Sequence, residues 1–267
     1  MADHMPFGFH LMPFLGTDIT VGDHYQVKLG PLTINLDTVW ATLVAGAIVC
    51  AMAIYLRRRS TSGVPSKFQM VWELGNEAVT RQIEGSVGER GLSVVPLALT
   101  LFVFILVCNA FELFGLGAHY EWLGAPTGDI NLTLALALFV IVLVHITWVR
   151  YWGIKAYAGH YLFHPFPVWL LPFNLFINLI EEIARPITLA LRLFGNLLAG
   201  TLMLTLIAAL GVWELGHIPI GNILVIILNP LWKIFDVFLI GPIQAFIFAL
   251  LTILYFDTAM SPPQEAH

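Results

Sequence analysis

Residues 174–196 of the chain read NLFINLIEEIARPITLALRLFGN. Polar and charged side chains recur in this stretch at steps of three or four positions, and such spacing places them on one face of an α-helix. They are Asn174, Asn178, Glu181, Arg185, Thr188, Arg192 and Asn196. The positions between them are mostly Leu, Ile, Phe and Ala. The stretch therefore predicts a helix with one polar stripe and an apolar back.

The stretch lies within a long apolar segment at residues 167–210, and a second one follows at residues 223–256. As continuous helices they would be about 65 Å and about 50 Å long, whereas the hydrocarbon core of a bilayer is about 30 Å thick. We expect both helices to tilt strongly, bend, or lie partly along the membrane. Proline can bend or break a helix, and the positions that could do so here are Pro172, Pro186, Pro230 and Pro242.

The composition favours a membrane protein. Of the 267 residues, 58% are hydrophobic and 11% are charged, whereas roughly a quarter are charged in an ordinary soluble domain. Three further apolar runs, at residues 37–56, 94–116 and 132–149, have close to the ~20 residues that span a bilayer. We predict an all-α integral membrane protein with five membrane passes. Its last two membrane helices are expected to be long and strongly tilted, forming a near-horizontal hairpin.

The positions of Lys and Arg predict the topology. Three arginines at residues 57–59 follow the first span and Arg150 follows the third, whereas the alternate loops at residues 117–130 and 211–222 contain neither Lys nor Arg. Basic loops face the cytoplasm. We therefore expect the N-terminus outside the cell and the C-terminus in the cytoplasm.

Three parts are expected along the chain: an extracytoplasmic tail at residues 1–36, a single membrane domain at 37–258, and a cytoplasmic tail at 259–267. In the first tail, apolar residues alternate on both sides of residues 30–31, which fits either a short β-hairpin or coil. Residues 66–88 carry apolar side chains at helical spacing with charges between them, which predicts an amphipathic helix on the cytoplasmic surface. No secretory signal pattern opens the chain, so the first span is expected to direct it to the membrane.

The two arginines of residues 174–196 differ in their local charge environment. Glu181 and Glu182 precede Arg185 by four and three positions, so a local ion pair can neutralise Arg185. Arg192 has no acidic residue three or four positions away on either side. A charge at bilayer depth costs at least ~2.5 kcal/mol. The counter-charge of Arg192 must therefore come from elsewhere in the fold or from another chain.

The second long segment carries a similar but sparser polar pattern, at Asn229, Lys233, Asp236 and Gln244. Lys233 and Asp236 are three positions apart, so they either form a buried ion pair or serve an ion path.

Histidine and cysteine give no sign of a metal or haem site. His145 fits a packing role in the third span, and His160 and His164 fit an interfacial one. Cys50 and Cys108 lie in predicted spans without metal-ligand spacing. We expect no cofactor. A net charge of -5 without a basic stripe also argues against nucleic acid as a partner.

Four motifs resemble one known family. They are LRLFGNLLAG at residues 191–200, GDINLTLALA at 128–137, IARPITL at 183–189, and QAFIF with LTI at 244–248 and 251–253. Over residues 66–258, and in the same order, the sequence is similar to the subunit a family of F-type ATP synthases, in its bacterial form.

The resemblance implies a stator subunit in the bacterial plasma membrane that carries out no ATP chemistry itself. It would form two offset aqueous half-channels against a rotating ring of c subunits, each with one membrane-embedded carboxyl group. Proton flow through the half-channels would drive rotation and so ATP synthesis. The other partners implied are b-type peripheral stalk subunits, the rest of the complex and membrane lipid.

The resemblance also implies roles for individual residues. Arg192 would separate the half-channels and face the ring. Chain direction would place Asn178, Glu181 and Glu182 toward the cytoplasmic half-channel. It would place Asn196, Thr201, Asp236 and Gln244 along the outer one. Glu214 and His217 fit either the outer channel mouth or a solvated pair in a loop.

This chain departs from the family pattern at three positions. Many relatives have Glu or His where this chain has Thr201, and some have an acidic residue where it has Asn178. The usual His or Glu of the last helix is also missing, and Lys233 and Asp236 are the nearest ionisable groups. We expect Asp236 to relay protons in the outer path, with water replacing a titratable group at Thr201.

Two other classes of protein fit this sequence less well. An ion-coupled secondary transporter usually has two related halves with paired broken helices, and no internal repeat occurs in this sequence. A membrane enzyme would need a nucleophile elbow or a metal-ligand pair, and the sequence has neither.

Overall fold

The computed structural model describes residues 26–29, 32–61, 63, 65–86, 89–114, 124–163, 170–212 and 220–260. Within them, five helices are long and apolar enough to cross a membrane. Their bounds are Leu36–Arg59, Gly91–Leu113, Ile130–Gly159, Leu171–Ala209 and Ile220–Met260. The prediction of an α-helical membrane protein with five passes is confirmed.

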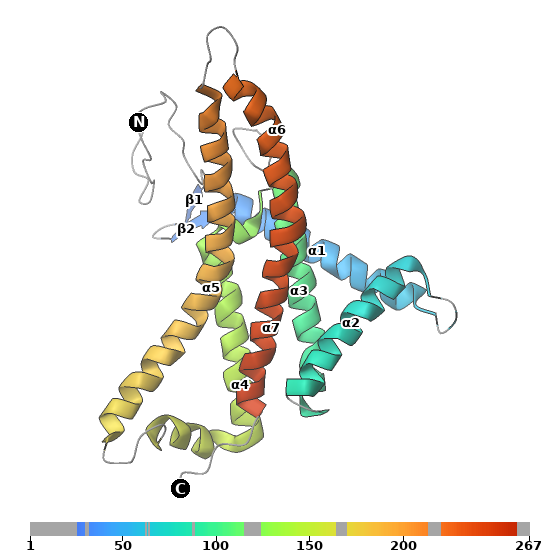
Figure 1. Ribbon diagram of the computed structural model, residues 1–267. Coiled ribbons are helices and arrows are strands. Elements are labelled where there is room, and N and C mark those ends of the chain that lie inside the picture. Colours follow the sequence, from blue (N-terminus) through green and yellow to red (C-terminus); the bar gives the residue numbers. More distant parts are fainter. Residues whose placement is uncertain are drawn as a thin grey trace.

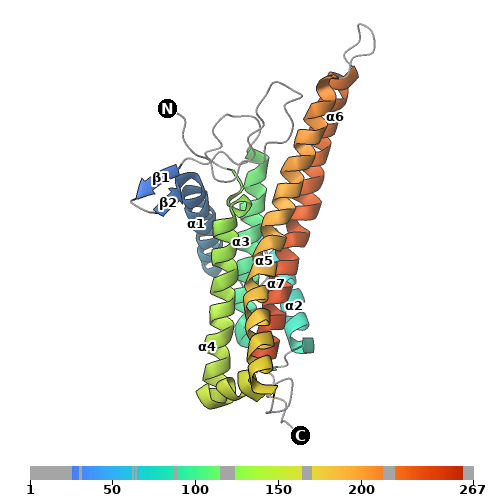
Figure 2. The same cartoon turned by 90° about the vertical axis from the view of Figure 1, so that its left-hand side faces the viewer.

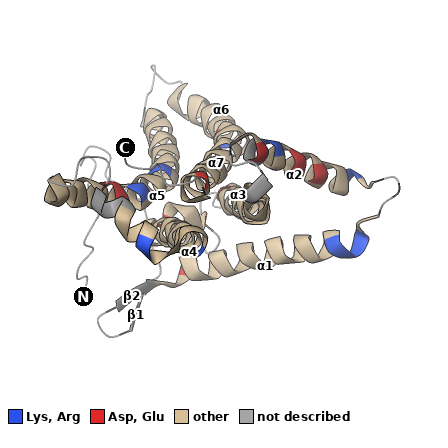
Figure 3. Ribbon diagram, turned by 90° about the horizontal axis from the view of Figure 1, so that it is seen from below, with Lys and Arg blue, Asp and Glu red and all other residues tan. Residues whose placement is uncertain are grey.

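A short hairpin precedes the first helix. β1 (Gln26–Leu29) pairs with β2 (Leu32–Asn35) in antiparallel register, with Val27 opposite Ile34. The helix α1 (Leu36–Arg59) follows β2 directly and ends in the three arginines, blue in Figure 3. An N-terminal structure of this kind was one of the two outcomes that the alternating apolar pattern allowed.

A helix is present where the amphipathic pattern predicts one: α2 (Lys67–Ser86). Arg81 and Glu77 form an ion pair on its exposed side, and Val71 and Leu74 are also exposed. α2 packs against the start of α3. Its location on the membrane surface stays a prediction.

The core lies where α3 (Val95–Ala110), α4 (Ile130–Phe163), α5 (Leu171–Ala209) and α7 (Gly241–Met260) pack together. Side chains that are almost fully buried there come from all four helices: Ile105, Val140, Leu189, Leu193 and Phe248. Short turns η2 (Phe111–Phe114) and η3 (Pro126–Gly128) lie at the adjoining ends of α3 and α4.

The last two predicted spans form a long helical hairpin (Figures 1 and 2). α5 is one continuous helix of 39 residues. Its partner is built from α6 (Ile220–Phe235), the π-helical turn η6 (Asp236–Ile240) and α7, which continue into one another. The connected end of the hairpin extends beyond the ends of α3 and α4 in Figure 2. Its tilt in the membrane stays a prediction.

The prolines in this hairpin do not break its helices. Pro186 lies inside α5 and Pro230 inside α6, and both helices continue through them. α5 nevertheless changes direction, so that its first half diverges from α7 while its second half runs beside α6 (Figure 1). A proline removes one backbone hydrogen bond and so favours a bend.

α4 extends further than its predicted span of residues 132–149. It continues to Phe163 but is interrupted at Gly153, whose φ of 81° and ψ of 160° are not helical. This combination is essentially restricted to glycine. After Gly153 the chain turns aside, and the last part of α4 crosses the lower end of the bundle in Figure 1.

Candidate functional site

Arg192 lies on the exposed side of α5. The neighbouring Leu189 and Leu193 are each 1% exposed and pack into the core, so the helix directs position 192 away from the bundle. Among the described residues, no carboxylate forms an ion pair with Arg192. This is the situation that the local sequence predicts: the fold leaves the guanidinium available to a charge outside this chain.

The backbone at Arg192 is held in place by the neighbouring helix. Gln244 of α7 is buried, and its side-chain amide donates a hydrogen bond of 2.6 Å to the carbonyl oxygen of Arg192. Because this bond joins two helices far apart in sequence, it fixes the level of Arg192 relative to α7. Gln244 was predicted as a channel residue, and its observed contact is with the backbone of the arginine.

One polar cluster lies between Arg192 and the connected end of the hairpin. Lys233 of α6 forms an ion pair with Glu112 of η2, with 2.8 Å between Nζ and Oε1. Both side chains are nearly buried, at 9% and 11% exposed. The ion-pair partner of Lys233 is therefore Glu112 and not Asp236. A Lys233–Asp236 pair was one of the two interpretations that their spacing allowed.

Asp236 lies beside this pair, at the start of the π-helical turn. It is 4% exposed, and its charged neighbours are Glu112 and Lys233. Its Oδ2 atom is buried and has no hydrogen-bond partner among the described residues. A Cβ atom at Gly200 of α5 would collide with this carboxylate. Glycine at position 200 is therefore what allows Asp236 to approach α5.

The remaining polar groups of this cluster connect several elements. Asn109 of α3 donates to the carbonyl oxygen of Gly241 at 3.2 Å and accepts from the hydroxyl of Thr127 at 2.8 Å. Both side chains are buried. Thr201 is half-buried and donates to the carbonyl of Leu197 in its own helix. Asn196 is also half-buried.

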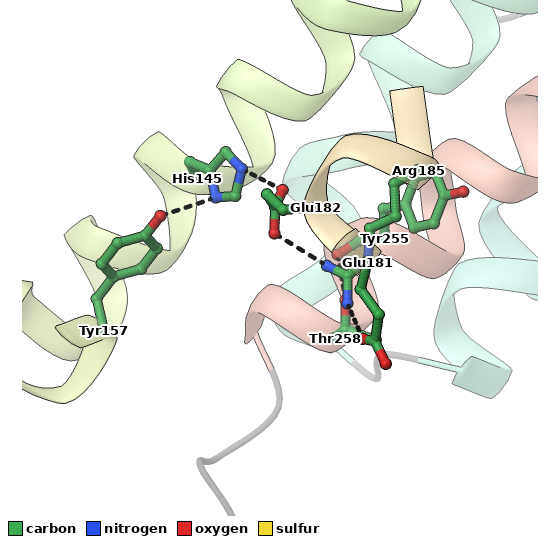
Figure 4. A network of polar contacts seen from close by, with 7 residues as sticks. All are labelled: His145, Tyr157, Glu181, Glu182, Arg185, Tyr255 and Thr258. Carbon is green, nitrogen blue, oxygen red and sulfur yellow. Dashed lines mark hydrogen bonds and ion pairs between the residues drawn. The ribbon is translucent and has the colours of Figure 1, made fainter. Parts of the chain in front are cut away.

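A second polar cluster, drawn in Figure 4, lies before Arg192 along α5. His145 of α4 meets Glu182 of α5, with 2.5 Å between Nε2 and Oε1. Arg185 lies 3.8 Å from Glu182 and 3.7 Å from Glu181, in agreement with their spacing. Tyr157 approaches the far side of the imidazole, with 3.4 Å between its hydroxyl and Nδ1.

The predicted residues thus divide into two groups along α5. Glu182 precedes Arg192 by ten positions and Gly200 follows it by eight, which correspond to about 15 Å and about 12 Å along a helix. Asn178 is half-buried on the Glu182 side, whereas Asp236 and Thr201 lie on the Gly200 side. Glu214 and His217 lie outside the described residues.

Three participants were missed from the sequence. Glu112 falls inside the predicted span 94–116, where an unexplained carboxylate is itself a signal. Its partner Lys233 is 121 positions away, and no local pattern indicates that pairing. Asn109 was not singled out, and His145 was interpreted as a packing residue although its ring nitrogens meet Glu182 and Tyr157. Within the described part of the chain, no group of three or more metal-type ligands occurs.

Comparison with known proteins gives one consistent result. The family model described as "ATP synthase A chain" matches residues 39–257. ATP synthase subunit a of Acidothermus cellulolyticus is 44% identical over 246 residues, covering 92% of this chain and 84% of the relative. ATP synthase subunit a of Mycobacterium tuberculosis is 41% identical over 265 residues, covering 95% and 98%. That of Alkalilimnicola ehrlichii is 36% identical over 253 residues, covering 91% and 92%.

Proposed function

Because this chain belongs to the ATP synthase A chain family, in which it is a non-catalytic membrane subunit, we propose that it forms the stator side of a proton channel. Its partner would be a rotating ring of c subunits, each with a carboxyl group within the membrane. Two half-channels, each open to one side only, would lead to and from that ring. The observation that carries the proposal is the exposed Arg192 between two separate polar clusters.

Arg192 would act on each ring carboxyl group that passes it. A guanidinium does not lose its proton in proteins, and a nearby positive charge favours the ionised form of a carboxyl group. The ring carboxyl would therefore release its proton on reaching Arg192. The fixed positive charge would also oppose direct passage of a proton between the two half-channels.

The outer half-channel would contain Asp236. A carboxylate that is almost fully buried, has an unsatisfied oxygen and lies against Gly200 is suited to exchange a proton with water or with the ring. The Glu112–Lys233 pair beside it adds a nearly buried ion pair to the same polar cluster. Asn196, Thr201 and Gln244 would complete this path with hydrogen-bonding groups.

The cytoplasmic half-channel would contain Asn178, Glu181 and Glu182. The side chain of Glu181 is 59% exposed and that of Glu182 is 21% exposed, so the two carboxylates lead from the surface of α5 into the bundle. This assignment places the N-terminus outside and the C-terminus in the cytoplasm. The b-type stalk subunits would hold the chain still while the ring turns.

Cysteine cross-linking within the assembled complex tests this arrangement. Leu191 is 49% exposed beside Arg192, whereas Ala190 is 2% exposed and faces the core. In a background that carries Cys50→Ser, we expect Leu191→Cys to form a disulfide with a cysteine placed next to the ring carboxyl. The matched Ala190→Cys variant should form none. A complex without a ring of small subunits, or an assembled Leu191→Cys complex that never cross-links, would contradict the proposal.

A further inference from the structure

The most elaborate polar arrangement outside the predicted channel residues surrounds His145. Placing a histidine within a membrane span costs free energy unless the side chain has a partner. Ionisable residues at such positions usually mark an ion path. Here the imidazole contacts a group on each side: Glu182 at Nε2 and Tyr157 at Nδ1. Each ring nitrogen therefore lies close to an oxygen atom of a different side chain, so a proton could reach the ring on one side and leave it on the other.

A break in α4 allows Tyr157 to contact His145. The two residues are 12 positions apart on α4, and in an unbroken helix that separation is about 18 Å. The non-helical backbone at Gly153 lies between them, and the segment after it turns aside from the axis of the first part of α4. The ring of Tyr157 consequently meets the edges of His145 and Trp148, with centroids 5.8 Å and 5.5 Å apart.

The charges around His145 leave room for one more proton. From α5, the two carboxylates of Glu181 and Glu182 face a single guanidinium, that of Arg185. Tyr255 and Thr258 of α7 lie beside the cluster (Figure 4) and have hydroxyl groups. A proton on His145 would balance the second carboxylate. The cluster can therefore hold one mobile proton, shared between Glu182 and His145.

We propose that His145 is a proton carrier of the cytoplasmic half-channel and exchanges its proton with Glu182. The inference rests on the proposed function and extends its path by one residue. During ATP synthesis, Oε1 of a protonated Glu182 gives its proton to Nε2 of His145, which leaves a carboxylate beside an imidazolium. The imidazolium then loses the proton from Nδ1, on the Tyr157 side, to water at the cytoplasmic end of α4. The neutral ring now carries its proton on Nε2, and exchange with water returns that proton to Nδ1 before the next transfer.

The test is the pH dependence of ATP synthesis with the intact complex in inverted vesicles, where the cytoplasmic face is open to the buffer. The proton-motive force is held constant while the cytoplasmic-side pH is varied from about 6 to 8, the range in which an ordinary imidazole titrates. In the unmodified complex the rate should rise with pH, because release from His145 becomes easier. In His145→Gln this rise should disappear and the rate should be lower.

Thr147→Val is the matched control. Thr147 is two positions away on the same helix, and its hydroxyl donates only to the carbonyl of Leu143 in its own helix. This variant should keep the pH profile of the unmodified complex, including any pH dependence that arises in the catalytic subunits. His145→Gln activity that is lowered by the same factor at every pH would show that His145 is only a structural link between α4 and α5, and would overturn the proposal.

The proposed function is judged separately by the behaviour of Arg192. If Arg192→Ala abolishes synthesis while His145→Gln keeps the unmodified pH profile, the channel stands and the role of His145 is wrong. If Arg192→Ala supports normal synthesis, the channel itself is wrong.

Discussion

Arg185 and Arg192 show how far the sequence predicts the environment of a single residue. The partners of Arg185 lie within one helical turn, so helical spacing alone predicts them, and the ion-pair distances agree. For Arg192 the same spacing predicts that a local partner is missing, and the described residues supply none. What the sequence could not supply were contacts between distant segments, such as Glu112 with Lys233 or His145 with Glu182. These depend on how helices pack, which residue spacing along one helix does not contain.

Gly200 provides a prediction at the scale of one residue. In Gly200→Ala the added methyl group would meet the carboxylate of Asp236, so the carboxylate must move or α6 must shift away from α5. We expect a clearly lower rate of proton-driven ATP synthesis in vesicles. The control is Gly195→Ala in the same helix, where nothing lies within 4 Å of the new Cβ. Equal rates in the two variants would show that the close contact between Asp236 and Gly200 is not needed for proton transport.

At the scale of helices, the predictions were accurate for existence and type and less accurate for shape. Apolar runs of spanning length predicted the five membrane helices. The long segments were expected to tilt, bend or break, and prolines offered places for this. α5 changes direction, whereas neither α5 nor α6 is broken at Pro186 or Pro230. The interruption at Gly153 was not predicted, because an isolated glycine in an apolar helix is often accommodated without a break. The π-helical turn at Asp236 also gives no clear sequence signal.

Gly153 provides a prediction at this scale. Its φ of 81° is strained for any other residue, at a cost on the order of 1–3 kcal/mol. We expect Gly153→Ala to lower the temperature at which the subunit is lost from the purified complex on heating. The control is Gly46→Ala in α1, where a Cβ meets nothing within 4 Å and alanine is the better helix former. The same temperature for both variants would mean that the break in α4 is not required.

At the scale of the whole molecule, the arrangement is more informative than any one residue. The family predicted from the motifs is confirmed by the match over residues 39–257. The structure adds two polar clusters on opposite sides of Arg192. One is nearly buried and joins η2 to α6, and the other is partly exposed and joins α4 to α5. If the polar face of α5 served only to join helices, no exposed arginine would be needed between the two clusters. The half-channels, the ring and the orientation in the membrane stay proposals.

The central claim is that Arg192 couples proton flow to the ring, and the most direct measurement is ATP synthesis by the complex in sealed vesicles under an imposed proton gradient. For Arg192→Ala we expect synthesis to fall to background although the complex assembles with its normal subunits. The control is Leu191→Ala, since Leu191 is the exposed neighbour of Arg192. This variant should retain most of the activity. Gradient-driven synthesis at a normal rate in the Arg192→Ala complex would contradict the account.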